Sequence, residues 1–414
     1  MKEIFEKIEQ SRELIIQLQK ELTKRVAIGP ENGGDGEYEK AVFIKKVLQE
    51  LKPDLIDEIN VPDKRVKCGF RPNLIIRWKK DKSDPSIWVL VHSDIVPPGD
   101  LSLWSGNPYE VRVEGDKIIG RGVEDNQHAF VSFYIAVKSI LETDKELLKH
   151  PVGLAVVADE ETGSRYGLRY ILEHHRDVFK KNDLIIVPDG GNEEGTMIEI
   201  AEKSMLWIRF EVRGIQCHAS TPDKGNNSLY AAAKLIVNLK KLTELFSEKD
   251  SLFSPPYSTF EPTKIESNVE NINTIPGRDV FYMDCRVLPN YSLDKITEEI
   301  RKIALSVEKE LGVKIDIETV YRLDAPQPTP KDSLVVKALS EAIERIKGKP
   351  AEVKGIGGGT VAAFLREKGL PAVVWSTVSD TAHKPDEYCL ISNIIDDAKI
   401  MAYVMSKRWD TTDK

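Results

Sequence analysis

The chain has 414 residues, more than one compact hydrophobic core usually organises, so we expect two domains. Its formal net charge of −8 comes without a basic block, which argues against nucleic acids and anionic membranes as partners. No segment resembles a membrane span or a signal peptide and the 4 cysteines form no C-x-x-C pair, so we expect a cytoplasmic protein without a disulfide framework or a thiolate zinc site.

The first half of the chain alternates predicted helices with short apolar strands. Near-helical spacing of apolar residues predicts amphipathic helices within 3–24 and 37–51, and apolar runs predict strands at 73–78 and 87–91. Further along, the pattern predicts a hairpin around Gly115-Asp116, helices at 126–141 and near 165–175, and strands at 152–158 and 184–187. Strands that are apolar on both faces are typical of a sheet covered by helices on both sides.

Polar side chains follow three of these strands at the point where each strand ends. His92, the acidic run Asp159-Glu160-Glu161, and Asp189 occupy these positions. Three consecutive carboxylates at the end of a buried strand are electrostatically costly unless a cation neutralises them. Because ligands of open α/β sheets bind outside the carboxyl ends of the strands, these side chains are candidates for a metal site.

The pattern changes near residue 204. Residues 205–213 alternate strictly, as expected of an antiparallel strand with one wet face, and this strand could lie at the edge of a sheet. The predicted elements that follow are a helix (228–246), two strands (264–270 and 280–288), a helix (292–311) and a strand (313–322). This β-α-β-β-α-β order predicts a ferredoxin-like domain at 204–322, inserted into an α/β domain formed by 1–203 and 323–414.

Five residues of the larger predicted domain have side chains that bind divalent ions: His92, Asp125, Glu161, Asp189 and His383. Taken singly, each has a simpler explanation; Asp125, for example, precedes a helix and could cap it. Together, two imidazoles and three carboxylates suit two divalent ions, with one bridging carboxylate and two private ligands for each ion. Since the set contains no cysteine, zinc is the expected metal, and cobalt or manganese could also bind.

Two further acids lie beside these candidate ligands. Asp94, two residues beyond His92, could accept the imidazole N–H and fix its tautomer. Glu160 is left over next to Glu161 and is placed to act as a general base toward water.

Six motifs, in this order, resemble those of a known family. They are HSD (92–94), GRGVEDN (120–126), ADEETG (158–163), PDGG (188–191), GIQCHASTPDKGNNS (214–228) and AHKPDEY (382–388). The chain is similar over nearly its whole length to the aminoacylase/carboxypeptidase family of cocatalytic zinc hydrolases. That family includes acetylornithine deacetylase, succinyl-diaminopimelate desuccinylase, glutamate carboxypeptidases and carnosinase-like dipeptidases.

The resemblance implies a zinc-peptidase-type catalytic domain, with a central mixed sheet flanked by helices, and an inserted lid or dimerisation domain. It places His92, Asp125 and Asp189 on one metal. Asp125, Glu161 and His383 would hold the other, so that Asp125 bridges, and Glu160 would be the base. At the position of the ligand Asp189, several deacylases have Glu. This difference slightly favours a similarity to the dipeptidase-like members of the family. Gln127 and His128 also depart from many relatives, but neither position is a ligand.

The resemblance also implies substrate-binding residues, namely His218, Asn273, Arg286, Gly358 and Gly359. In many relatives the inserted domain forms a homodimer and sends its motif histidine, here His218, to the substrate carbonyl oxygen in the neighbouring active site. Arg286 would bind a substrate carboxylate, because a guanidinium offers it bidentate geometry. The alternatives are a turn histidine at 218 and an ion pair between Arg286 and Asp284.

The expected function is therefore a dinuclear-metal hydrolase that cleaves an amide bond in a small carboxylate-bearing substrate: a dipeptide, a short peptide C-terminus or an N-acyl amino acid. One alternative is a strict N-acyl amino acid deacylase of the acetylornithine or succinyl-diaminopimelate type, and another is an inactive binding protein on the same fold. GIGGGT at 355–360 could indicate a dinucleotide-binding oxidoreductase. The third glycine of that fingerprint is missing and no acid ends the next strand, which argues against it.

Overall fold

The computed structural model describes residues 1–79 and 85–409 and divides into two compact units. The larger unit contains Met1–Ile200, Pro328–Lys354 and the described residues from Thr360 onward. The smaller unit contains Ala201–Gln327 and Gly355–Gly359. These limits lie a few residues from the expected 204–322, and the short glycine segment of the smaller unit was not anticipated. Residues 410–414 of the expected catalytic domain lie outside the described residues.

The larger unit is built on an eight-stranded mixed sheet. In spatial order its strands are β1 (Leu55–Pro62), β2 (Phe70–Trp78), β6 (Val152–Val157), β3 (Ile87–His92), β7 (Leu184–Asn192), β16 (Ala372–Thr377), β8 (Met197–Glu202) and β15 (Glu352–Ile356). The central strands β6, β3, β7 and β16 run parallel to one another, whereas β2 pairs antiparallel with β1 and β6, and β8 pairs antiparallel with β16. The parallel centre brings the carboxyl ends of β3, β6 and β7 to one edge of the sheet.

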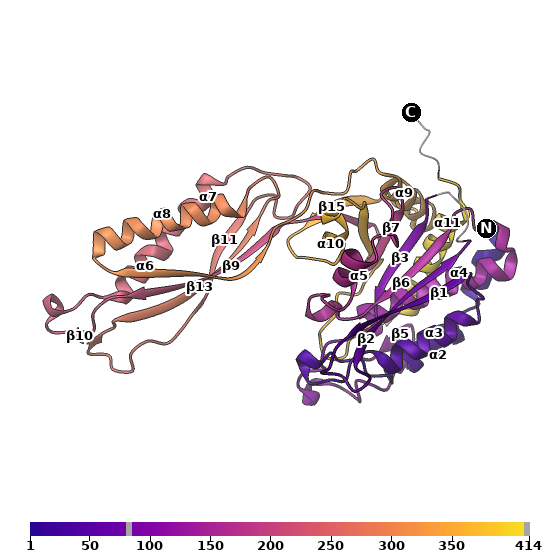
Figure 1. Ribbon diagram of the computed structural model, residues 1–414, viewed down its shortest axis with the longest axis horizontal. Helices are drawn as coiled ribbons and strands as arrows, with labels where there is room; N and C mark the ends of the chain where they lie inside the picture. The colour runs from indigo at the N-terminus through magenta and orange to yellow at the C-terminus, as the bar shows by residue number, and fades with distance from the viewer. Residues whose placement is uncertain (80–84, 410–414) are drawn as a thin grey trace. The chain divides into compact units, whose positions relative to one another are not determined.

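Helices cover both faces of this sheet (Figure 1). They are α1 (Lys2–Glu9), α2 (Arg12–Thr23), α3 (Tyr38–Gln49), α4 (His128–Thr143), α5 (Leu168–His174), α9 (Leu334–Lys347), α10 (Ala362–Glu367) and α11 (Ile391–Ser406). Trp88 and Leu90 of β3 belong to the core cluster that includes α5 and α10. Since alternate residues of a strand point to opposite faces, Val89 and Val91 point to the other side, where α4 contacts β3 and α11.

The helix expected within 3–24 is interrupted between α1 and α2, where the Ser11 hydroxyl donates to the carbonyl oxygen of Lys7. The predicted hairpin around residue 115 is confirmed as β4 (Arg112–Glu114) and β5 (Lys117–Ile119). A third strand, β17 (Tyr388–Leu390), pairs with β5 and thereby brings the AHKPDEY segment back to this part of the unit.

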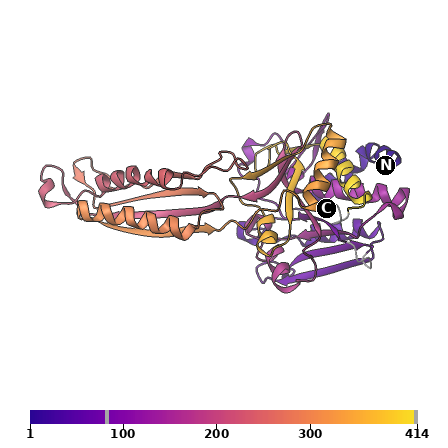
Figure 2. The same ribbon diagram turned by 90° about the horizontal axis from the view of Figure 1, so that it is seen from above.

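The smaller unit has the predicted ferredoxin-like order. Its elements are β9 (Ser204–Arg213), β10 (Cys217–His218), α6 (Ser228–Leu239), α7 (Lys241–Leu245), β11 (Thr259–Ile265), β12 (Thr274–Ile275), β13 (Arg278–Val287), α8 (Leu293–Leu311) and β14 (Lys314–Leu323). Four antiparallel strands form a sheet in the order β11-β13-β9-β14. Leu206, Ile208, Phe210 and Val212 alternate along β9 and are buried with residues of α6 and α8, which lie side by side along the sheet (Figure 2).

Two expectations for the smaller unit are wrong. β9 is a central strand with β13 and β14 on its two sides, because the first strand of a β-α-β-β-α-β unit lies between the third and the fourth. The strand expected at 264–270 is β11 at Thr259–Ile265, so it begins earlier. Pro262 lies in this strand next to an irregularity of the register, which an edge position tolerates because an edge strand leaves backbone groups unpaired.

Within residues 1–79 and 85–409, no helix has both the length and the apolar character needed to cross a bilayer. All four cysteines are free thiols, as expected from their scattered positions. Cys285 and Cys389 are buried, and burial raises the pKa of both thiols well above the ordinary value.

Candidate metal centre

The five predicted ligands meet at one end of the larger sheet, and each comes from a different segment. They are His92, the last residue of β3; Asp125, in the loop before α4; Glu161, in the turn after β6; Asp189, in β7; and His383, in the loop before β17. Their ligand atoms form two groups of three, and Asp125 belongs to both. The structure thus brings together residues that are up to 291 positions apart in the sequence (383 − 92).

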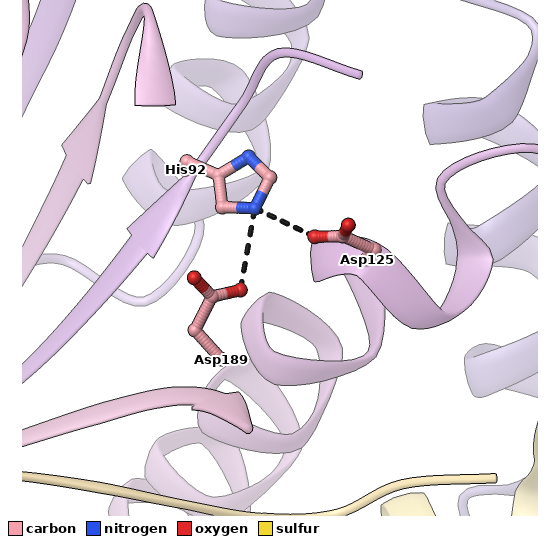
Figure 3. A group of neighbouring side chains, drawn as sticks. All are labelled: His92, Asp125 and Asp189. Carbon is pink, nitrogen blue, oxygen red and sulfur yellow. Dashed lines mark hydrogen bonds and ion pairs between the residues drawn. The ribbon is translucent and has the colours of Figure 1, made fainter. Parts of the chain in front are cut away.

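The first group consists of His92, Asp125 and Asp189 (Figure 3). The Nε2 atom of His92 lies 2.9 Å from Oδ1 of Asp125 and 3.4 Å from Oδ1 of Asp189. The side-chain amide of Asn126 donates to the same Asp189 oxygen at 3.0 Å and to the carbonyl oxygen of Pro188 at 2.7 Å. Asn126 therefore fixes the position of the Asp189 carboxylate relative to the loop that carries Asp125.

The second group forms on the other oxygen of Asp125. The Nε2 atom of His383 lies 3.0 Å from Oδ2 of Asp125 and 3.2 Å from Oε2 of Glu161. The two carboxylate oxygens of Asp125 thus face different imidazoles, which is the geometry of a bridging ligand. The helix-cap alternative does not apply, because α4 begins at His128 without a side-chain capping bond.

The charges of the site fit divalent cations. Burial raises the pKa values of Glu161 and Asp189, so their ionised forms are costly without a nearby cation. Burial would lower the pKa of His92, but the neighbouring acids, Asp189 foremost, raise it well above its ordinary value. Hydrogen bonds to Asp125 and Glu161 raise the pKa of His383 to about 10. The carboxylates of the site therefore favour a nearby positive charge, which divalent ions bound by the two imidazoles in their neutral form would supply.

Asp94 joins the first ligand to the acidic turn. Its buried carboxylate accepts backbone N–H bonds from Glu160 at 3.1 Å and from Glu161 at 3.0 Å. The Nδ1 atom of His92 lies 3.1 Å from the backbone carbonyl oxygen of Asp94 and 3.5 Å from the carboxylate. The ring is thus oriented from the backbone of Asp94, while the carboxylate holds the turn that carries Glu160.

The Glu160 carboxylate belongs to neither ligand group, but it interacts electrostatically with the ligands Asp189, His92 and Glu161. Burial raises its pKa well above the ordinary value, and the charge of Asp189 adds to this effect. A carboxylate with a raised pKa that is not occupied as a ligand has the properties of a general base near neutral pH.

Asp159, the first member of the acidic run, has a structural role. It adopts a left-handed backbone conformation with φ 62°, and its carboxylate accepts the backbone N–H of Tyr166 at 2.9 Å. Below it, Arg71 and Glu37 form a fully buried ion pair, and an Arg71 nitrogen lies 3.8 Å from Asp159. Only two of the three consecutive acids therefore take part in the site, and the third shapes the turn.

Two buried acids that were not predicted connect the ligand loops. The Glu387 carboxylate accepts hydrogen bonds from three backbone N–H groups of residues 122–125, at 2.9–3.0 Å. In return, the Glu124 carboxylate accepts backbone N–H bonds from two residues of 379–381. These reciprocal bonds tie the Asp125 loop to the His383 loop. Glu124 lies in the motif GRGVEDN and Glu387 in the motif AHKPDEY, so their position next to predicted ligands could have indicated a role in the site.

Comparison with known proteins identifies the family. Residues 88–407 match the model of peptidase family M20/M25/M40. The chain belongs to this family. An uncharacterized metallohydrolase of Methanocaldococcus jannaschii is 40% identical over 407 residues, which cover 94% of this chain and 98% of that protein. The M20 assignment agrees with the sequence-motif resemblance and makes the protein a hydrolase.

Other M20 members span different substrates. The chain is 25% identical to a succinyl-diaminopimelate desuccinylase of Pelagibacter ubique, over 78% of this chain and 83% of that protein. A solved Bacillus subtilis structure, described as a dinuclear metal binding peptidase of the M20 family, has 17% identity and a TM-score of 0.65, covering 96% of this chain and 98% of that one. The family thus contains both deacylases and peptidases, so membership alone does not select the substrate.

The predicted substrate-binding residues all lie in the smaller unit, in two separate places. The strand β10, which contains His218, pairs with β12, and the backbone N–H of Ala219 donates to the carbonyl oxygen of Asn273 at 2.9 Å. Arg286 lies near the other end of β13, where it donates to the carbonyl oxygen of Gly357 at 3.0 Å. Figure 1 shows β10 beyond the end of β13 that begins at Arg278.

Local hydrogen bonds determine which atoms of these side chains are available. The backbone N–H of Ser220 can only donate, and it lies 3.1 Å from Nδ1 of His218, so that nitrogen is an acceptor. In the neutral ring the proton is therefore on Nε2, which can donate to a carbonyl oxygen. Arg286 instead forms a bidentate pair with Asp284, at 2.7 and 3.0 Å, which is the ion pair that the alternative interpretation predicted.

The geometry of Asp125 leads to a prediction about metal content. Replacing Asp125 with Ala removes one ligand from both groups, so metal affinity should fall by more than about 100-fold, the upper range for the loss of a residue that merely supports a ligand. Elemental analysis of purified protein measures the change, with Asp332→Ala, an exposed acid of the same unit, as the control. Unchanged metal content in Asp125→Ala would exclude the bridging role.

Proposed function

We propose that this M20 protein is a dinuclear-metal hydrolase that cleaves an amide bond in a small carboxylate-bearing substrate. The observation that carries the proposal is the pair of ligand groups that share Asp125, with the carboxylate of Glu160 beside them. The donor set of imidazoles and carboxylates favours zinc, with cobalt or manganese as alternatives. The dipeptide, the short peptide C-terminus and the N-acyl amino acid are the substrate classes that this chemistry can serve.

Different groups of the site have different roles in the proposed reaction. Bound divalent ions would polarise the scissile carbonyl group and lower the pKa of a water molecule. Glu160 removes a proton from the attacking water and later delivers it to the leaving amine, two transfers that the raised pKa of its carboxyl group favours. Asp94 positions the backbone of Glu160 by accepting its N–H bond, which fixes the turn from which the side chain of the base extends.

A strict N-acyl amino acid deacylase is the alternative, favoured by relatives named succinyl-diaminopimelate desuccinylase. Both reactions pass through a tetrahedral carbon, so the metal centre supports them equally. A panel of dipeptides and of N-acetyl, N-succinyl and N-carbamoyl amino acids separates the two. The complete ligand set and Glu160 argue against an inactive binding protein.

A cytoplasmic location stays a prediction from the sequence.

The proposed base leads to a second prediction. Glu160→Ala should keep the metal content of the wild type, because Glu160 is in neither ligand group, and should lower kcat by about 10²- to 10⁴-fold, the usual contribution of a general base. Steady-state kinetics and elemental analysis are measured on the same preparation. Glu160→Gln, which preserves shape but cannot accept the proton as a carboxylate does, should behave alike. Full turnover in either variant would overturn the mechanism.

We also propose that Arg286 recognises the substrate carboxylate. Its guanidinium is half-buried rather than sealed, and the pair with Asp284 leaves the Nη1 atom bonded only to Met205 and the carbonyl oxygen of Gly357 among the described residues. Gly357 and Gly358 have no atom near the position of a Cβ, so a ligand could approach the backbone there. An entering carboxylate would exchange with Asp284 on the same planar fork.

The carboxylate proposal predicts how substrate and enzyme changes combine. Amidating the C-terminus of a cleaved dipeptide should lower the kcat/KM of the wild type by about 10-fold or more, and should lower it little further in Arg286→Ala, because the partner group is already absent. Asp284→Asn is the matched control: it removes the internal competitor and should retain the preference for the free acid. If the wild type cleaves amidated and free-acid substrates equally well, the carboxylate role and the exopeptidase assignment both fail.

A homodimer formed through the smaller unit is the third part of the proposal. Along β13, Arg278 and Arg286 are eight residues apart, about 26 Å at 3.3 Å per residue, and His218 lies beyond the first of them. A small substrate bound at Arg286 therefore cannot reach His218 of the same unit. On α6, Tyr230 and Val237 are 65% and 70% exposed on the same side, which supplies an apolar surface for a second copy.

Mixing two inactive variants tests whether His218 acts across the dimer. His218→Ala should keep its metals and lose most of its kcat, and so should Glu160→Ala. In a mixed dimer, the chain with intact Glu160 receives His218 from its partner, so random reassociation should restore about a quarter of the wild-type activity. Light scattering must show a dimer for each variant. A fully active monomer, or no recovery in mixtures with proven subunit exchange, would contradict the proposal.

A further inference from the structure

A cavity of about 400 Å³ opens in the larger unit away from the ligand cluster. It lies between the segment that joins α5 to β7 and the turn that joins α10 to β16. Because β7 and β16 are parallel neighbours, the segments that precede them are brought together at the amino-terminal edge of the sheet. From Leu184 to the metal-ligand candidate Asp189, β7 then runs five residues, about 16 Å. The cavity and the candidate metal centre are therefore at opposite ends of the same strand.

The floor of the cavity is apolar and rigid. Leu172, Phe179 and Leu370 line it and are also members of the buried core cluster of this unit. The ring of Phe179 packs edge-on against Trp88, with centroids 5.0 Å apart, and the Trp88 indole donates to Asp183 at 3.0 Å. Since core packing holds these side chains in place, the floor is preformed and does not have to be assembled by a ligand.

The rim of the cavity is cationic. Arg176, Lys181 and Lys368 line it together with His175. Within the described part of the chain, none of the three cations has a carboxylate at ion-pair distance; the one contact given for Arg176 is a 3.4 Å bond to the carbonyl oxygen of Glu173. The chain as a whole carries a net charge of −8, so three unpaired cations around one cavity form a positive region on an acidic protein.

The nearby acids do not supply the missing partners. Glu173, Asp177 and Glu367 are neighbours of the rim residues in the sequence, but none of them lines the cavity. The buried carboxylate of Asp183 is occupied by the backbone N–H groups of Ser86 and of Lys180 and by the indole of Trp88. The rim cations are thus available to a ligand from solution.

We propose that this cavity is a second ligand site, which binds a small amphipathic anion: one carboxylate, sulfonate or phosphate group attached to an apolar body. The cationic rim attracts the anionic group, and the apolar floor removes the body from water at about 25 cal/mol per Å² of buried surface. The volume lies within the usual range for sites of small molecules. The proposed hydrolytic reaction does not require this second site.

The experiment uses 8-anilinonaphthalene-1-sulfonate, an apolar anion whose fluorescence rises on binding, titrated into the full-length protein. In Lys181→Glu/Lys368→Glu the affinity of the strongest site should fall by about 10-fold or more, because each change replaces an attraction with a repulsion. The control Lys331→Glu/Lys337→Glu alters the net charge equally at exposed lysines that do not line the cavity, and should bind within about two-fold of the wild type.

The neutral probe N-phenyl-1-naphthylamine separates charge from apolar binding and should bind the cavity variant and the wild type alike. Thermal unfolding verifies that the exposed changes leave the fold intact; if the double variant does not fold, Lys181→Gln and Lys368→Gln replace it, each with an expected loss of about three-fold. Equal sulfonate affinity in wild type and cavity variants, or an equal loss in the control, would overturn the proposal.

Discussion

The carboxylate of Asp125 contacts two imidazoles, one on each oxygen, and the arrangement of the larger unit depends on this shared contact. His92 arrives at the end of a central strand, whereas His383 comes from a loop near the other end of the chain. For both to reach one carboxylate, the loop before α4 has to be held in a fixed position between them. The buried acids around the site provide that position.

Those acids hold the loops mainly through backbone N–H groups, and Glu387 and Glu124 also accept side-chain bonds from Arg121 and Thr381. Asp94 holds the turn with Glu160 and Glu161, Glu387 holds the Asp125 loop, and Glu124 holds the loop before β17. A buried carboxylate is costly unless it is hydrogen-bonded, and loop N–H groups are costly to bury without an acceptor. Pairing the two kinds of group solves both problems and leaves the ligand side chains free to bind a cation.

The smaller unit separates the groups that the family resemblance assigns to one substrate. His218 is held by the turn at Ser220, beyond one end of β13, and Arg286 lies near the other end beside Asp284. The sequence names both residues but contains no measure of the distance between them, because that distance follows from the continuous, unbroken length of β13. The proposed homodimer therefore rests on the geometry of this strand.

Elements with strong apolar patterns were predicted well, and those without them were not. The buried strands β3, β6 and β7 and the alternating β9 carry their period in the sequence. β1 is an edge strand with largely exposed or half-exposed side chains, so it leaves no apolar run to detect. The position of β9 in the centre of its sheet was also missed, because a strand's own pattern does not identify its neighbours.

The sequence by itself determined the family, the mixed α/β class with an inserted ferredoxin-like unit, and the identity of all five candidate ligands, since these follow from ordered motifs and local periodicity. Only the tertiary structure decided that Asp159 shapes the turn and that Glu124 and Glu387 join two loops. It also decided that three rim cations surround one cavity at the start of β7. These features depend on contacts between segments distant in the chain, and no local pattern records such contacts.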